Sequence, residues 1–332
     1  MAARRRTSPK DKSPTKEKKH PGTVFVMSDV GRRTHRQLEP VVKAVRAARQ
    51  EGQNPTVLVD GAIVSSPFEA KALKGKHPLR RKLEAKVAAG TATAQERSLL
   101  RDLHAGRYLT HVYSKTNPKG YAKLVAENRR SVAAKARKLA NASGKQDVLV
   151  LRGNAERDQR RDFGIDAGKF KHVKLIGELS ARVMGNVALV TIPFGIKPTP
   201  LTLNRLARQV RQLKRDGKKV ILVTHVNPFL SPHGKSKWAY RTALRGKPSK
   251  IGKEELNEIT NFRAIAGAIL PDTVLYGHVH QKPDFRSFTW KKWRIEKGKR
   301  VVAEVPTFFM FEDALVKINT RTGKVSIQKV GK

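Results

Sequence analysis

Polar side chains of the kinds that bind metal ions follow five short apolar runs of this sequence. The set contains two aspartates, one asparagine and three histidines: Asp29, Asp60, Asn154, His225, His278 and His280. Carboxylate, amide and imidazole groups together suit Mn²⁺, Fe or Zn²⁺. Each member alone has a simpler interpretation, such as a turn at Asp60-Gly61, a helix cap at Asn154 or a buried core histidine at His225. All of them in this order, each at the end of an apolar run, predict a divalent-metal site.

The five apolar runs predict the strands that would position these side chains. They are continuous and rich in β-branched residues, as is typical of strands buried on both faces of an α/β sheet, and they occupy residues 23–27, 56–59, 148–151, 220–223 and 273–276. Ligands of such sheets bind at the carboxyl ends of the strands, so we expect the six polar side chains to converge there. Two hairpins are predicted as well, over residues 182–192 and 314–328.

A long helical section is predicted between the second and third runs. Thr93 and Glu96 have the spacing of a capping box, which marks a helix start. Further along, apolar residues recur at helical spacing, with lysines and arginines off the stripe: Leu124, Val125, Val132, Ala136 and Leu139. The stripe predicts a helix face packed on the core, and the basic residues predict its solvated face.

The order of these motifs resembles that of the calcineurin-like metallophosphoesterase superfamily, from about Thr23 to Val330. The family pattern is Asp-x-His, Gly-Asp-x-x-Asp, Gly-Asn-His-Asp/Glu, a lone His after a strand, and Gly-His-x-His. The resemblance implies a two-sheet α/β/β/α sandwich with a dinuclear metal centre that hydrolyses phosphoesters. The Lys, Arg and Pro residues of 1–21, with almost nothing apolar among them, predict a disordered basic tail. The resemblance implies one domain over residues 22–330. The domain would carry a helical insertion at about 70–145 and basic loops at 230–255 and 282–300.

The resemblance also implies how the ligands would be shared between two metal positions. Asp60 would bridge the two ions. Asn154, His225 and His278 would complete one site, and Asp29 and His280 would belong to the other.

Two histidines of the family pattern are missing from this chain. Gly31 stands where the Asp-x-His motif has its ligand, and Ala155 stands where the third motif has the catalytic His. The second motif departs too, with Val59 in place of Gly and Ile63 or Val64 where an acid often falls. Because charge-stabilising groups contribute about 10²–10³ in rate, we identify no catalytic residue and expect weak or no turnover. We expect one bound ion, with two as the alternative, in which case His35 is a candidate replacement ligand.

The charge of the chain predicts a polyanionic partner. Its 332 residues include 70 Lys and Arg against 27 Asp and Glu, a formal net charge of +43. Such charge repels itself in a compact state, and neutralising phosphates releases counterions, so nucleic acid is the leading candidate. Cations, some beside aromatic residues that could stack on bases, predict the contact residues: Arg4, Arg5, Arg6, Lys235, Lys237, Trp238, Tyr240, Arg241, Lys291, Lys292, Trp293 and Arg294.

RNA is favoured over DNA, in a ribonucleoprotein or ribosome-like assembly, because a basic Pro- and Lys-rich tail suits folded RNA. The alternative is an active metal-dependent phosphodiesterase or nuclease. A pure protein-interaction scaffold is disfavoured by the charge. The chain has no cysteine, which excludes disulfides and Cys-ligated zinc. With no signal peptide and no apolar run of about 18 residues, we expect an intracellular, cytoplasmic protein without a membrane partner.

Overall fold

A computed structural model of the chain describes most of its regular structure. The described residues are 22–28, 30, 38–61, 63, 78–97, 100, 118–153, 156, 160, 164–225, 253–277, 288–296, 299–309 and 314–329. The predicted tail, residues 1–21, lies outside them, so it stays a prediction.

The first sheet has six strands in the order β12-β11-β1-β2-β3-β4. Their bounds are β1 Thr23–Ser28, β2 Pro55–Asp60, β3 Val148–Leu151, β4 Val173–Ile176, β11 Ala314–Asn319 and β12 Val325–Lys329. Strands β1 to β4 run parallel, whereas β11 pairs antiparallel with both β1 and β12. Three of the five predicted runs therefore lie in this sheet with their carboxyl ends at one edge, and the predicted C-terminal hairpin is confirmed.

The second sheet also has six strands, in the order β5-β6-β7-β8-β10-β9. Their bounds are β5 Ser180–Met184, β6 Val187–Ile192, β7 Lys219–Thr224, β8 Thr273–Tyr276, β9 Phe288–Glu296 and β10 Lys299–Phe309. Strands β6, β7, β8 and β10 run parallel, and β5 and β9 close the two edges as antiparallel strands. The other two predicted runs are β7 and β8, and the predicted hairpin over 182–192 is the β5–β6 pair.

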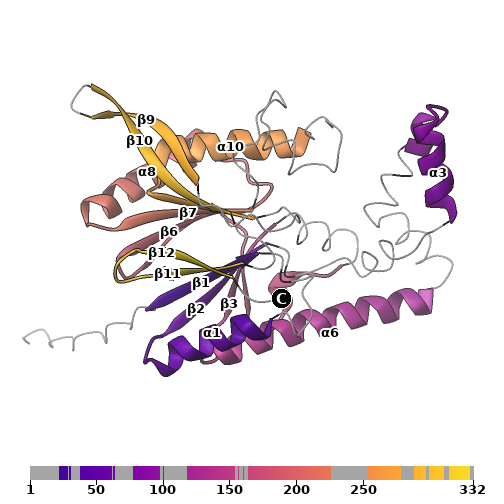
Figure 1. The fold of residues 1–332 in the computed structure, drawn as a ribbon, viewed down its shortest axis with the longest axis horizontal. Coiled ribbons are helices and arrows are strands. Elements are labelled where there is room, and N and C mark those ends of the chain that lie inside the picture. Colours follow the sequence, from indigo (N-terminus) through magenta and orange to yellow (C-terminus); the bar gives the residue numbers. More distant parts are fainter. Residues whose placement is uncertain are drawn as a thin grey trace, which may run out of the picture.

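The two sheets form the inner layers of a four-layer sandwich (Figure 1). Because side chains alternate along a strand, β1 contributes Phe25 and Met27 to a core under α1 and α6, and Val24 and Val26 to the core between the sheets. A third core lies between the second sheet and helices α8 and α10. This arrangement is the predicted α/β/β/α fold.

Four helices supply the outer layers: α1 Glu39–Gln50, α6 Pro118–Ala142, α8 Pro200–Arg215 and α10 Lys253–Ile269. The predicted stripe of α6 is confirmed, with Val125, Val132, Ala136 and Leu139 buried. Helix α8 begins after Thr199, whose hydroxyl accepts a hydrogen bond from the Thr202 amide at 3.2 Å, with Pro200 in the first turn.

The predicted helical insertion is described in part. Helix α3, Pro78–Ala88, lies beside the four layers rather than within them (Figure 1). The capping box is confirmed, since the Thr93 amide donates to Glu96 Oε2 at 2.9 Å and the Glu96 amide donates to Thr93 Oγ1 at 3.1 Å. Among the helices that the structure describes, none combines the length and apolarity needed to cross a bilayer.

The prediction of basic loops is wrong where the structure describes those segments. Residues 288–296 form strand β9, which pairs with β10 over nine residue pairs from Lys299↔Glu296 to Thr307↔Phe288. Aromatic and β-branched residues favour strands, and this segment contains five of them among its nine residues, so its β propensity outweighs the charge that suggested a loop. Residues 253–255 begin helix α10.

Candidate metal centre

The carboxyl ends of strands from both sheets bring two of the predicted ligands together. Asp60 is the last residue of β2, and His225 directly follows β7. Their side chains are 0% and 1% exposed. Asp60 lies level with Ser28 on β1 and Leu151 on β3, and Thr224 lies level with Tyr276 on β8. The described strand ends therefore converge as the sequence predicts.

The ring of His225 is oriented by the backbone of Asp60. His225 Nδ1 lies 3.1 Å from the Asp60 carbonyl oxygen and 4.0 Å from Asp60 Oδ1. A carbonyl oxygen can only accept, so Nδ1 carries the proton and donates it. In the neutral imidazole the lone pair then belongs to Nε2. A histidine whose other nitrogen donates to a backbone carbonyl is the usual arrangement for a metal ligand.

The same carbonyl oxygen is held from the other side by β1. Ser28 Oγ donates to it at 3.2 Å. The last residue of β2 is thus fixed by one hydroxyl from its own sheet and one imidazole from the opposite sheet. This cross-sheet bonding fixes the backbone from which the Asp60 side chain extends.

Three glycines allow the backbone to approach Asp60 and His225 closely. Gly61 has φ +69°, and a Cβ there would lie 2.6 Å from His225 Cε1. A Cβ on Gly153 would lie 2.9 Å from His225 Cδ2, and one on Gly277 would lie 2.7 Å from Asp60 Oδ2. Larger residues at these positions would occupy the space around the two functional groups.

Glu156 was not among the sequence-predicted site residues, yet it fixes two loops of the site. It is buried, and its carboxylate accepts hydrogen bonds from the Gly153 amide at 2.9 Å and the Ile63 amide at 2.7 Å. The loop after β3 is thereby joined to the loop after β2. The signal was present in the sequence, because an acid three residues after Gly153 has the spacing of a capping interaction.

Arg152 joins the two sheets beside this site. Its backbone carbonyl accepts from the Phe194 amide at 2.7 Å, and its Nε donates to the Phe194 carbonyl at 3.2 Å. The segment after β6 is further held by α10, since the Gly195 amide donates to Glu258 at 2.9 Å. The end of the sandwich that carries Asp60 and His225 is therefore fastened by hydrogen bonds from both sheets.

Four of the six predicted ligands lie outside the described residues: Asp29, Asn154, His278 and His280. Gly31, His35 and Ala155 also lie outside them. The residues that precede three of these ligands are described, and all three contact the Asp60–His225 pair. Ser28 bonds to Asp60, while Gly153 and Gly277 pack against His225 and Asp60. The residues that directly precede Asp29, Asn154 and His278 therefore all lie beside Asp60 and His225.

The described donors fit a divalent ion. A buried carboxylate and an imidazole with a fixed tautomer are ligands for Mn²⁺, Fe or Zn²⁺, and three glycines leave room beside them. Within the described part of the chain, no group of three or more His, Cys, Asp or Glu residues has metal-ligand geometry. The count of ions and the remaining ligands stay predictions.

Tyr276 precedes one of the three glycines of the site on the second sheet. It ends β8 immediately before Gly277, and it is fully buried. Burial raises the pKa of its phenol well above the ordinary value, because the charged form loses its hydration. Tyr276 therefore stays neutral. Because alternate residues of a strand share a face, it lies on the same face of β8 as Val274, toward α8 and α10 and away from the Asp60–His225 pair.

Most of the predicted nucleic-acid contacts cannot be placed. Lys291, Lys292, Trp293 and Arg294 lie on strand β9. The others are outside the described residues: Arg4, Arg5, Arg6, Lys235, Lys237, Trp238, Tyr240 and Arg241.

A cationic surface that the sequence reading missed lies on α8. Arg205, Arg208, Arg211 and Arg215 are exposed, whereas Leu206, Ala207 and Val210 are buried against the second sheet. At 100° per residue the four arginines fall within about 120° around the helix axis, opposite the buried positions. The helix contains no acid. The absence of any acid over residues 200–215 was the available sequence signal.

Comparisons with known proteins leave the function of this chain open. No family model matches the sequence, and no curated protein matches it. A dimetal phosphatase from Danio rerio is similar at TM-score 0.38 and 9% identity, over 94% of this chain and 100% of that one. GAP50, the anchor in the inner membrane complex of Plasmodium, is similar at TM-score 0.37 and 10% identity, over 94% and 89%. Neither likeness is close enough to transfer a function, and the fold described above rests on its own strand order and packing.

Proposed function

We propose that this chain is a nucleic-acid-binding protein, with RNA favoured over DNA, built on a calcineurin-like metallophosphoesterase scaffold whose metal centre is partly degenerate and turns over little. The observation that carries the binding function is the arginine stripe of α8, defined as Arg205, Arg208, Arg211 and Arg215. Its four arginines lie on one exposed face of a helix that contains no acid. The formal charge of +43 supports the same class of partner.

The stripe has the dimensions of a phosphate-contacting surface. From Arg205 to Arg215 it extends about 15 Å along the helix axis at 1.5 Å per residue. One strand of a duplex carries one phosphate per about 3.4 Å of axis, so the stripe spans about four phosphates. Guanidinium groups bind phosphate oxygens in a bidentate manner, which favours Arg over Lys at such a surface. Phosphate contacts of this kind position nucleic acid without reading its sequence.

The metal centre is proposed to keep its architecture and lose most of its chemistry. Asp60, Asn154, His225 and His278 would hold one ion, and Asp29 and His280, with Asp60, would offer a weaker second position. Such an ion supplies Lewis-acid polarisation of a phosphoester when bound. Of the chain's own groups, the Asp60 backbone holds the Nδ1 proton of His225, and Ala155 offers no side chain to stabilise developing charge.

A second candidate function is a metal-dependent phosphodiesterase or nuclease. One observation favours it, namely that Asp60 and His225 remain buried and hydrogen-bonded in an arrangement suited to a ligand pair. Burying a carboxylate is costly unless it is paired with a cation or coordinates a metal ion, so a buried carboxylate beside an imidazole favours ion binding.

The test of the binding proposal is the salt dependence of affinity. A fluorescein-labelled single-stranded RNA is titrated with the full-length protein over a range of KCl concentrations, and anisotropy gives the dissociation constant. We expect the logarithm of affinity to fall linearly and steeply with the logarithm of salt concentration. A duplex of the same length and the DNA strand of the same sequence serve as comparisons. A flat salt response, or no binding at low salt, contradicts the proposal.

A further inference from the structure

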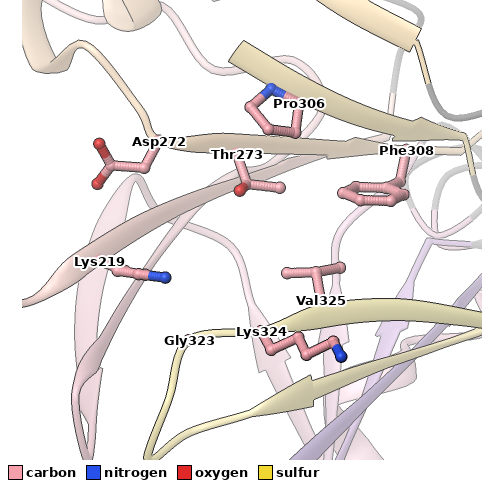
Figure 2. Close-up of a pocket in the computed structure, with 8 residues that line it drawn as sticks. All are labelled: Lys219, Asp272, Thr273, Pro306, Phe308, Gly323, Lys324 and Val325. Carbon is pink, nitrogen blue, oxygen red and sulfur yellow. The ribbon is translucent and has the colours of Figure 1, made fainter. Parts of the chain in front are cut away.

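A pocket lies between the two sheets at the end of the sandwich opposite the candidate metal centre. Its volume is about 460 Å³, within the range of small-molecule sites. Lys219 and Thr273 on its wall begin β7 and β8, whereas His225 and Gly277 follow the other ends of those strands. The opposite wall is the β11–β12 turn with Gly323, Lys324 and Val325 (Figure 2). The pocket is thus distinct from the metal centre.

The interior of the pocket is apolar and includes an aromatic ring. Phe308 and Val325 are partly buried, with part of their surface against the core between the sheets, and both line the pocket. Pro306 and Thr273 complete this wall, as Figure 2 shows. A ring and a proline on one wall are a surface on which a planar group can stack.

Two lysines stand at the exposed rim of the pocket, one from each sheet. Lys219 and Lys324 are solvent-exposed, and among the described residues neither has a carboxylate within ion-pair distance. A Cβ on Gly323, where φ is +67°, would lie 3.1 Å from Lys219 Cγ, so the Lys219 stem lies across this glycine. Figure 2 shows the Lys219 ammonium directed toward the space between the sheets. The lysine is therefore partly ordered before a ligand arrives.

The one acid that lines the pocket does not offset these lysines. Asp272 Oδ1 is paired with Lys214 Nζ at 3.2 Å, and Oδ2 accepts from the Val220 amide at 2.8 Å. Its carboxylate points away from the pocket interior (Figure 2). The rim is consequently positive, and it prefers an anion.

The turn that carries Lys324 is anchored to the second sheet. The Asn186 amide donates to the Thr320 carbonyl at 2.7 Å, and Asn186 Nδ2 donates to the Arg321 carbonyl at 2.8 Å. The Lys219 amide in turn donates to the Asn186 carbonyl at 2.9 Å. Both walls are therefore joined by hydrogen bonds, and the pocket is largely preformed.

We infer that this pocket binds one unpaired nucleotide of a single-stranded nucleic acid, with the base against Phe308 and Pro306 and the adjacent phosphates between Lys219 and Lys324. An apolar, aromatic interior with a cationic rim matches the two parts of a nucleotide, and aromatic stacking accepts any base. The inference rests on the proposed nucleic-acid-binding function and adds to it a preference for single strands. A duplex keeps its bases stacked inside, so it cannot fill the pocket.

The experiment compares four proteins with a fluorescein-labelled strand of about ten uridines at about 150 mM salt. The pocket variants are Lys324→Glu, which reverses a rim charge, and Phe308→Leu, which keeps apolar volume but removes the ring. The control is Lys174→Glu, an equal charge change on exposed β4, at the opposite edge of the first sheet from β12. Thermal melting shows whether each variant is folded. If Phe308→Leu fails to fold, the inference is tested by Lys324→Glu together with photo-cross-linking of the wild-type protein.

We expect both pocket variants to weaken single-strand binding about tenfold, with an effect of about twofold or less from Lys174→Glu. Duplex binding should respond to Phe308→Leu by about twofold or less, because no base reaches the ring. With 4-thiouridine in the wild-type complex, photo-cross-linking should label the tryptic peptide 301–317, which contains Phe308.

Failure of the inference is distinguishable from failure of the proposed function. If the wild type binds the strand, but Lys324→Glu weakens it no more than Lys174→Glu and the cross-link maps elsewhere, the pocket inference is wrong and the binding function stands. If the wild type binds no strand, the proposed function fails, and the inference fails with it. If calorimetry shows that uridine monophosphate binds the wild type but not Lys324→Glu while the strand does not bind, the pocket is a free-nucleotide site, and the single-strand inference is overturned.

Discussion

The Asp60–His225 pair is the residue-scale basis of the metal-site hypothesis. Each side chain comes from a different sheet, and one backbone carbonyl connects them. The hydrogen bond to Nδ1 determines which ring nitrogen can bind a metal, a detail that sequence spacing cannot supply. The sequence could predict both residues as ligands, because each ends an apolar run. The spacing of Glu156 from Gly153 could be read from the sequence, but its hydrogen bond with the Ile63 amide, 93 residues away, could not.

A first prediction concerns the ligand role of His225. Isothermal titration with Mn²⁺ should find about one ion per wild-type chain, and His225→Ala should remove that binding, because Nε2 is the lone-pair nitrogen. His172→Asn is the control, because His172 directly precedes β4 and is not a proposed ligand. Asn tolerates the positive φ of 67° at this position. Unchanged Mn²⁺ binding by His225→Ala would contradict the ligand role.

A second prediction concerns the close approach at Gly61. Gly61→Ala should lower the free energy of unfolding by about 2–3 kcal/mol, because the substitution adds both a strained φ and an overlap with the His225 ring. Gly52→Ala is a matched control. It has φ +77° with nothing within 4 Å of the added Cβ, so it should cost only about 1 kcal/mol. Urea denaturation measures both, and equal losses would mean that the His225 contact contributes nothing.

A third prediction concerns Lys135, a lysine of α6 that is only 5% exposed. Burial lowers its pKa from 10.5 to about 8, because the ammonium loses hydration. Between pH 8 and pH 10.5 the unfolded chain therefore binds more protons than the folded one at this residue. The free energy of unfolding contributed by Lys135 therefore rises with pH between pH 8 and pH 10.5. Below pH 8 the lysine is charged in both states, so the cost of burying the charge is fully present.

Lys135→Met should therefore increase the free energy of unfolding at pH 7 by about 1–2 kcal/mol and reduce its rise between pH 8 and pH 10.5. Lys123→Met, an exposed position on the same helix, is the control and should change little. Denaturant unfolding at several pH values measures both. Destabilisation at pH 7 by Lys135→Met would show that an interaction of the ammonium outweighs its desolvation.

At the scale of elements, continuous apolar runs were sufficient to predict five central strands, but not the edges of the sheets. Strand β4 is short and only Ile176 in it is buried, so it carries no continuous apolar signal. The two lysines and one arginine of strand β9 predict a basic loop, although the aromatic and β-branched residues between and around them form a strand. Helix α8 was missed, although Thr199 and Pro200 mark its start. Edge strands and outer helices contact one layer only, so their sequences are less constrained by burial.

A fourth prediction concerns the arginine stripe of α8. Replacing Arg208 and Arg211 with Gln should weaken single-stranded and duplex RNA alike and reduce the slope of log affinity against log salt by about two. The control is the double change Lys171→Gln and Lys174→Gln, which removes two exposed charges before and within β4. Equal slopes for the two double variants would mean that only the total charge matters. Melting temperatures should be unchanged, because all four side chains are exposed.

At the scale of the whole molecule, the sandwich separates two kinds of chemistry. The candidate metal centre lies at the carboxyl ends of the parallel strands, whereas the lysine-rimmed pocket lies at their amino ends. The apolar pattern predicted an α/β protein, and the resemblance of its motifs predicted two sheets. The pocket could not be predicted from sequence, because it exists only where the β11–β12 turn meets the second sheet. Net charge predicts a polyanionic partner but not where that partner binds.

The central proposal is that the protein binds nucleic acid and cleaves it little or not at all. The most direct measurement incubates full-length protein with end-labelled single-stranded RNA and excess Mn²⁺, and then divides each sample between a native and a denaturing gel. We predict that the native gel shows a salt-sensitive complex and that the denaturing gel shows the strand intact. Cleavage that requires Mn²⁺ and disappears in His278→Ala would contradict the claim and identify a nuclease, and an unbound strand would contradict it as well.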